Sequence, residues 1–198
     1  EKNIIYYDDK FIIGKSNLGS DIYDVLLFAR RDIDNVTIPS FITRISPYSF
    51  NFCSKLKNVD FLKDSKIQCI DKNSFTYSSI ERVFIPKNLK EIENCSFVSC
   101  KKLREIEFEE NSKLKIIKDY AFGFTSIEKI TFPSSLRIIK FHTFSGCPQL
   151  KTVEFPRDSE LRVMTNKMKN ILSQYEQRLQ ILEEKHQENL NQIGALGH

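Results

Sequence analysis

A pattern of about 23 residues recurs six times in this chain of 198 residues, and this repeat constrains the fold more than any other feature. The segment "SFNFCSKLKNVDF" at 49–61 returns as "SFVSCKKLREIEF" at 96–108 and as "TFSGCPQLKTVEF" at 143–155. The interval of 47 residues between these copies covers two units, whose lengths alternate between 23 and 24 residues. The units begin at Val36, Val59, Val83, Ile106, Ile130 and Val153.

Each unit starts with a triplet whose first and third residues are apolar, such as Val83 and Ile85. This period of two places both side chains on one face of a β-strand, and one unit alone cannot bury them. Stacked units bury them together and pair their triplets into a parallel sheet, which is the arrangement of a solenoid. Where a proline follows the triplet, it ends the strand without interrupting the sheet; this occurs at Pro39, Pro86, Pro133 and Pro156.

The alternation in length has a local origin. The second and fourth units carry two extra residues soon after the triplet, in "FLKDSKI" and "FEENSKL". The same units lack one residue later, in "FTYSSI" and "FGFTSI". We therefore expect two kinds of coil to be stacked in turn.

The unit resembles the leucine-rich repeat of the Treponema pallidum type, found in BspA-like proteins. The strand of that repeat matches "LKNVDF", "LREIEF" and "LKTVEF". Its Ala-Phe pair matches Ser49-Phe50, Ser74-Phe75, Ser96-Phe97, Ala121-Phe122 and Thr143-Phe144. The chain departs from the family at a glycine, which is replaced by Ser46, Asp71, Glu93, Lys118 and Lys140. The fold that we expect is an α/β solenoid, with a parallel β-sheet on the concave face of the repeats and a long C-terminal α-helix after them.

This resemblance also implies a class of function. BspA-like repeats occur in microbial surface proteins, including many from parasitic protozoa such as trichomonads, where adhesion and binding of host proteins are the implied roles. A location at the cell surface or outside the cell would follow from the same resemblance. The alternative is an intracellular scaffold protein that has the same repeats and no host ligand.

Three segments are predicted along the chain. Residues 1–35 break the repeat pattern and form an N-terminal cap, in which "NIIYYDDKFIIG" indicates a hairpin that precedes a mixed segment. Residues 36–164 hold the six repeats. Residues 165–198 change in composition: 166–193 contain no Gly or Pro and are rich in Gln, Glu, Lys and Leu, which favours one long helix.

The C-terminal helix has the heptad pattern of a coiled coil. A lone amphipathic helix needs a partner surface, which is either another copy of the chain or the open end of the last repeat. We favour self-association into a homo-oligomer, because the apolar face of this helix extends beyond what one repeat could cover. The heptad a and d positions are Met168, Leu172, Tyr175, Leu179, Leu182, His186, Asn189 and Ile193.

The concave sheet is the expected place for a protein ligand. The middle residue of each triplet points away from the core, and so does the residue that precedes the triplet. Phe84 beside Arg82, with glutamates on the next strand, is the kind of aromatic and arginine cluster that anchors protein interfaces. The candidate ligand-binding residues are Asp60, Arg82, Phe84, Glu105, Glu107, Lys129 and Thr131.

Other classes of function find little support in the sequence. The net charge is only +4, from 30 basic and 26 acidic residues that are interspersed, which argues against a nucleic-acid partner. No apolar run reaches the roughly 20 residues that a membrane span requires. The chain has five cysteines without metal-ligand spacing, which we expect to be reduced and buried. We expect no catalytic residues, no metal and no cofactor.

Overall fold

The computed structural model describes residues 3–140, 142–157 and 159. The chain divides into one unit of residues 1–160 and a second unit of residues 161–198. Every regular element among the described residues is a β-strand, so the repeats form a β-solenoid rather than an α/β solenoid. The connections between the repeat strands are turns and irregular segments. The expected C-terminal helix and its heptad positions lie outside the described residues.

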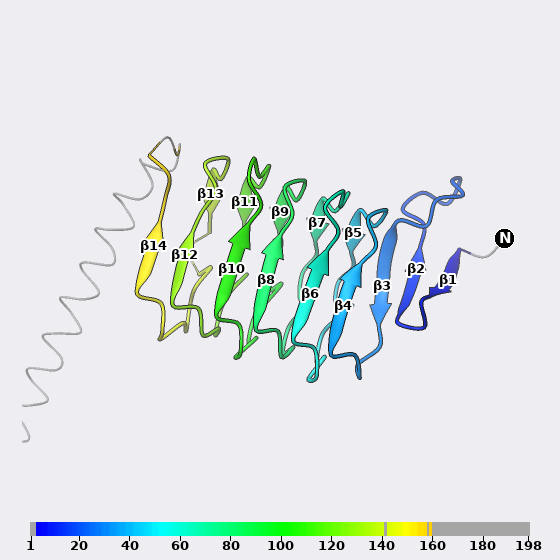
Figure 1. The fold of residues 1–198 in the computed structure, drawn as a ribbon, viewed down its shortest axis with the longest axis horizontal. Coiled ribbons are helices and arrows are strands. Elements are labelled where there is room, and N and C mark those ends of the chain that lie inside the picture. The colour runs from blue at the N-terminus through cyan, green and yellow to red at the C-terminus, as the bar shows by residue number, and fades with distance from the viewer. Residues whose placement is uncertain (1–2, 141, 158, 160–198) are drawn as a thin grey trace, which may run out of the picture. The chain divides into compact units, whose positions relative to one another are not determined.

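The predicted triplets lie side by side as the large parallel arrows of Figure 1, the first four in one parallel sheet and the last two in a separate two-stranded sheet. The register follows the repeat, since Val36 pairs with Val59 and Val83 pairs with Ile106. The predicted strand positions are confirmed. The strands are β4 (Asn35–Ile38), β6 (Asn58–Phe61), β8 (Arg82–Ile85), β10 (Glu105–Phe108), β12 (Lys129–Thr131) and β14 (Thr152–Glu154).

A second parallel sheet was missed by the sequence analysis. Its repeat strands have only two residues each, which is too short for a period of two to be visible in the sequence. One residue of each pair is buried, as Ile45, Ile70 and Ile92 are. These strands are β5 (Arg44–Ile45), β7 (Cys69–Ile70), β9 (Glu91–Ile92), β11 (Ile116–Ile117) and β13 (Ile138–Ile139).

The N-terminal strands extend this second sheet. β1 (Ile4–Tyr7) and β2 (Phe11–Gly14) form the predicted antiparallel hairpin, whose turn holds Asp8 and Asp9 at positive φ. β3 (Val25–Ala29) pairs antiparallel with β2 and parallel with β5. The N-terminal segment therefore covers the first repeat by continuing its backbone pairing (Figure 1).

A ladder of phenylalanine rings fills the centre of the solenoid. It consists of the phenylalanines of the small-residue and Phe pairs, and the first four are fully buried. Their ring centroids lie 4.7 Å apart between Phe50 and Phe75, 5.0 Å between Phe75 and Phe97, 5.5 Å between Phe97 and Phe122, and 5.7 Å between Phe122 and Phe144. Stacked rings at these distances add to the burial energy, so the repeated Phe stabilises the stacking of the coils.

The cysteine expectation is correct in part. All five cysteines are free thiols. Cys53 and Cys100 are buried, and burial raises the pKa of the Cys100 thiol to about 12. Cys69, Cys95 and Cys147 are half-buried, so the prediction that all five are buried is wrong. Cys69 and Cys95 lie outside the central column that Cys53 and Cys100 share, and Cys95 lies in a turn at positive φ.

The missing family glycine does not strain the backbone. None of Ser46, Asp71, Glu93 and Lys118, which replace this glycine, has a positive φ. The left-handed residues come two positions later in each loop, at Tyr48, Asn73, Cys95 and Tyr120.

Candidate functional site

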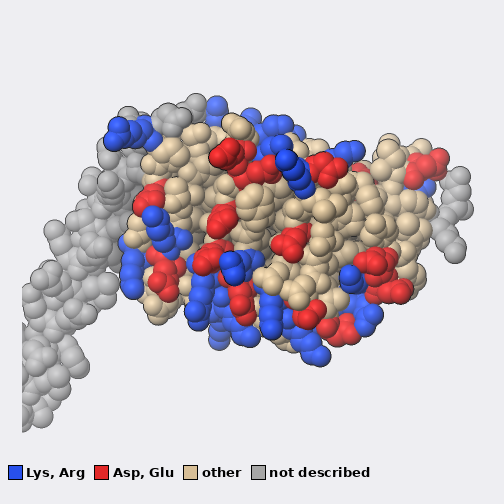
Figure 2. All heavy atoms as spheres, viewed as in Figure 1, with Lys and Arg blue, Asp and Glu red and all other residues tan. Residues whose placement is uncertain are grey.

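All seven candidate ligand-binding residues are exposed on the triplet strands. Buried and exposed residues alternate along each strand, as in β8, where Val83 and Ile85 are buried and Arg82 and Phe84 are exposed. This alternation follows from the side-chain period of two in a β-strand. The sequence therefore placed these side chains on the correct face, and Figure 2 shows that acidic and basic groups are interspersed there.

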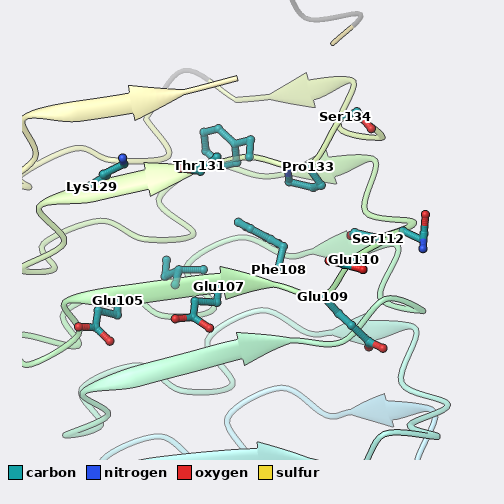
Figure 3. Close-up of a pocket in the computed structure, with 13 residues that line it drawn as sticks. Glu105, Glu107, Phe108, Glu109, Glu110, Ser112, Lys129, Thr131, Pro133 and Ser134 are labelled. Carbon is teal, nitrogen blue, oxygen red and sulfur yellow. The ribbon is translucent and has the colours of Figure 1, made fainter. Parts of the chain in front are cut away.

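A pocket of about 670 Å³ opens on this face between β10 and β12. Its polar lining comes from Glu105 and Glu107 of β10, Lys129 and Thr131 of β12, and the loop after β10. Four of the seven candidate residues thus line one cavity. Figure 3 shows Phe108 projecting between the two strands, with the glutamates along one side and Lys129 and Thr131 along the other.

The pocket lies where the sheet is open. Backbone pairing is complete between β4 and β6, between β8 and β10, and between β12 and β14. Pairing is limited to two residue pairs between β6 and β8, and β10 and β12, both wholly described, are not joined by a ladder. We call this unpaired junction the seam.

A two-residue insertion precedes both weak junctions. Both weak junctions follow an even-numbered unit, in which the extra residues come directly after the strand. Such an insertion has to leave the stack, so the next strand loses register at that end. At the seam, Phe108 is half-buried and its ring centroid lies 6.0 Å from that of Phe132.

Ion pairs neutralise part of the charge around the pocket. The carboxylate of Glu105 lies 3.5 Å from the guanidinium group of Arg82, and the carboxylate of Glu109 lies 3.6 Å from the ammonium group of Lys87. Lys129 lies 2.7 Å from Glu154, and this hydrogen bond lowers the pKa of the Glu154 carboxyl. Within the described part of the chain, Glu107 and Glu110 form no ion pair. The pocket therefore keeps an excess of negative charge that is exposed to solvent.

Three of the candidate residues lie outside the pocket. Asp60 is on β6, while Arg82 and Phe84 are on β8. Phe84 pairs with Glu107 across the ladder and exposes 41% of its side chain beside the pocket. The sequence analysis missed Phe108, Glu109, Glu110 and Pro133 as pocket residues. The insertion "FEENSKL" was the available signal, because it contains three of these four residues.

The described residues offer no arrangement for a metal. No group of three or more His, Cys, Asp or Glu side chains in that part of the chain could hold an ion. No helix among the described residues is long and apolar enough to cross a membrane. The side chains that line the pocket can offer charge, hydrogen bonds and apolar contact to a ligand.

Sequence comparison agrees with the repeat geometry. The profile described as the BspA type leucine rich repeat region matches six copies, in residues 22–151 and 115–168. The chain belongs to this family. A search of curated proteins gives no match.

Two solved structures have a similar fold. One is the pneumococcal vaccine antigen PcpA, with a TM-score of 0.65 and 26% sequence identity over 81% of this chain. The chain spans 40% of the length of that structure. The other is a leucine-rich repeat protein from Bacteroides capillosus, with a TM-score of 0.52 and 17% identity, covering 78% of this chain and 99% of that one.

Proposed function

We propose that this chain is a non-enzymatic protein-binding module of an adhesive surface protein, and that it binds a basic segment of its partner at the seam between β10 and β12. The observation that carries this proposal is the 670 Å³ pocket, which is lined by four glutamates and one lysine. Membership of the BspA-type family supports a protein ligand, because leucine-rich repeat proteins bind proteins in general.

The apolar floor of the pocket supports a side chain with both a charge and an apolar stem. Phe108 lies between the strands, and Phe84 is exposed at the edge. An arginine or lysine of a partner can place its stem over these rings and its charged end near Glu107. Glu107 carries no ion pair in the described part of the chain, so such a contact displaces no existing partner.

Binding of a basic peptide tests this proposal. We expect the full chain to bind acetyl-Arg-Gly-Arg-amide in calorimetric titrations at low salt, and Glu107→Gln to weaken binding about fivefold, because one close charge pair contributes roughly 1 kcal/mol. The matched control is Asp60→Asn, which removes a carboxylate at the same outward position two strands away. Binding that is insensitive to Glu107→Gln, or equally sensitive to both changes, contradicts the proposal.

Multivalent display is the second part of the proposal. A homo-oligomeric coiled coil formed by Leu172, Leu179 and the other heptad residues would present several copies of a weak site. Linked weak sites gain avidity without new contacts, so oligomerisation suits adhesion. The heptad pattern of residues 166–193 supports this part, and those residues lie outside the described structure.

A further inference from the structure

The loops that follow the short strands form a third ladder, separate from the pocket. The N–H of Phe52 donates to the carbonyl of Thr76 at 2.9 Å, and the equivalent N–H groups of Tyr77, Ser99 and Phe124 make the same bond to the next loop at 3.1, 2.8 and 2.9 Å. The loops therefore repeat in one register. Equivalent side chains form a column, which we call the turn column and which consists of Phe52, Tyr77, Ser99, Phe124 and Gly146.

The aromatic residues of the turn column are exposed and strained. Phe52, Tyr77 and Phe124 expose 60%, 51% and 50% of their side chains, and all three have positive φ. The left-handed region is unfavourable for a residue with a side chain and favourable for glycine, and Gly146 adopts it at the end of the same column. Neither burial nor backbone preference accounts for three aromatic residues at these positions.

The turn column lacks one ring. Phe52 and Tyr77 are stacked, with centroids 5.0 Å apart and planes 9° apart. Ser99 takes the next position, so the backbone positions of Tyr77 and Phe124 are two steps apart, which is about 10 Å at the usual spacing of strands. That distance equals two stacking distances, which leaves room for one planar group above Ser99.

Phe124 does not fill the vacant position. Its ring contacts the following loop, since a Cβ atom added to Gly146 would lie 2.4 Å from the Cδ1 atom of Phe124. Ser99 is itself half-exposed. The step at Ser99, flanked by Tyr77 and Phe124, thus carries no ring of its own in the column, and we call this step the slot.

We propose that this slot binds an aromatic side chain of a protein partner, at a second surface that is independent of the acidic pocket. A ring inserted there would continue the stack begun by Phe52 and Tyr77. Lys101 and Lys102 follow Ser99 closely and are both exposed, so a guanidinium group would meet like charge, whereas a neutral ring flanked by acidic residues would not. The acidic pocket prefers a basic segment and the slot prefers an aromatic residue with acidic neighbours, so the two surfaces select different partners.

Tryptophan fluorescence tests this inference directly, because the chain contains no Trp. The probe is acetyl-Glu-Trp-Glu-amide, titrated with the full chain. We expect a saturable change in its emission. Ser99→Phe should fill the slot and weaken binding at least about tenfold, and Tyr77→Gly should do the same by removing one wall. Phe52→Gly is the matched control: it removes an aromatic residue with similar exposure and φ that does not border the slot, and it should change the affinity less than about twofold.

Folding is checked in the same variants by thermal unfolding. Ser99→Phe should unfold at a higher temperature than the unmodified chain, since the new ring stacks between two others. Absence of binding, binding unchanged by Ser99→Phe, or equal losses in Tyr77→Gly and Phe52→Gly would overturn the inference. Equal displacement by acetyl-Glu-Leu-Glu-amide would show that no ring is required, and displacement by adenosine monophosphate at the same concentration would assign the slot to nucleotides instead of protein; both results also overturn it.

Discussion

At the scale of the residue, a small polar column supports the phenylalanine ladder. The thiol of Cys100 donates to the carbonyl of Phe75 at 3.0 Å, and the thiol of Cys147 makes the same bond to Phe122. Ser78 and Thr125 lie in the intervening units and contact these two sulfur atoms at 3.3 Å. The repeated cysteine is therefore a hydrogen-bond donor as well as a filler of the core.

This contact makes the polarity at position 100 more important than its exact volume. We expect Cys100→Ser to lower the free energy of unfolding by less than about 1 kcal/mol, because a hydroxyl can reach the same carbonyl. Cys100→Val should lower it by about 1 kcal/mol more than Cys100→Ser does, since the carbonyl of Phe75 loses this donor and keeps the N–H of Ser78. Urea unfolding measures both. If the valine variant is as stable as the serine variant, the hydrogen bond contributes nothing.

At the scale of the element, the two kinds of repeat produce two kinds of junction. Complete pairing at β8 and β10 and the open seam at β10 and β12 predict a difference in hydrogen exchange. We expect the slowest amides of β12 to exchange at least about tenfold faster than those of β8, because β12 has a ladder on one side only. Equal protection of the two strands, measured by NMR, would mean that the seam is closed in solution.

Much of this architecture could be predicted from the sequence, because the repeat reports it several times over. The triplets starting at Val36 and Val83 specified strand position, register and outward face. The two-residue strands, such as β7, could not be predicted because two residues are too few for an alternation to be recognised. The seam depends on how an inserted loop alters the next junction, and the alternation in length was visible without showing which junction would open. The turn column was hidden because left-handed φ at Phe52 or Tyr77 is unusual for aromatic residues.

At the scale of the whole molecule, oligomerisation decides whether weak sites act together. Light scattering of the full chain should give a multimer. The double change Leu172→Asp and Leu179→Asp should give a monomer, because charges at heptad a positions oppose helix association. The matched control is Ser173→Asp with Gln180→Asp, which adds the same charge away from the heptad a and d positions. A monomeric unmodified chain, or equal masses for the two double variants, would contradict multivalent display.

The most direct test of binding at the seam is to locate the basic peptide by NMR. The amide resonances of the full chain are followed while acetyl-Arg-Gly-Arg-amide is added. We predict that the largest shifts fall in residues 105–112 and 129–134, which line the pocket between β10 and β12. Shifts spread over exposed acidic residues of β6 and the turns, with none concentrated at the seam, would contradict the claim that this pocket is the protein-binding site.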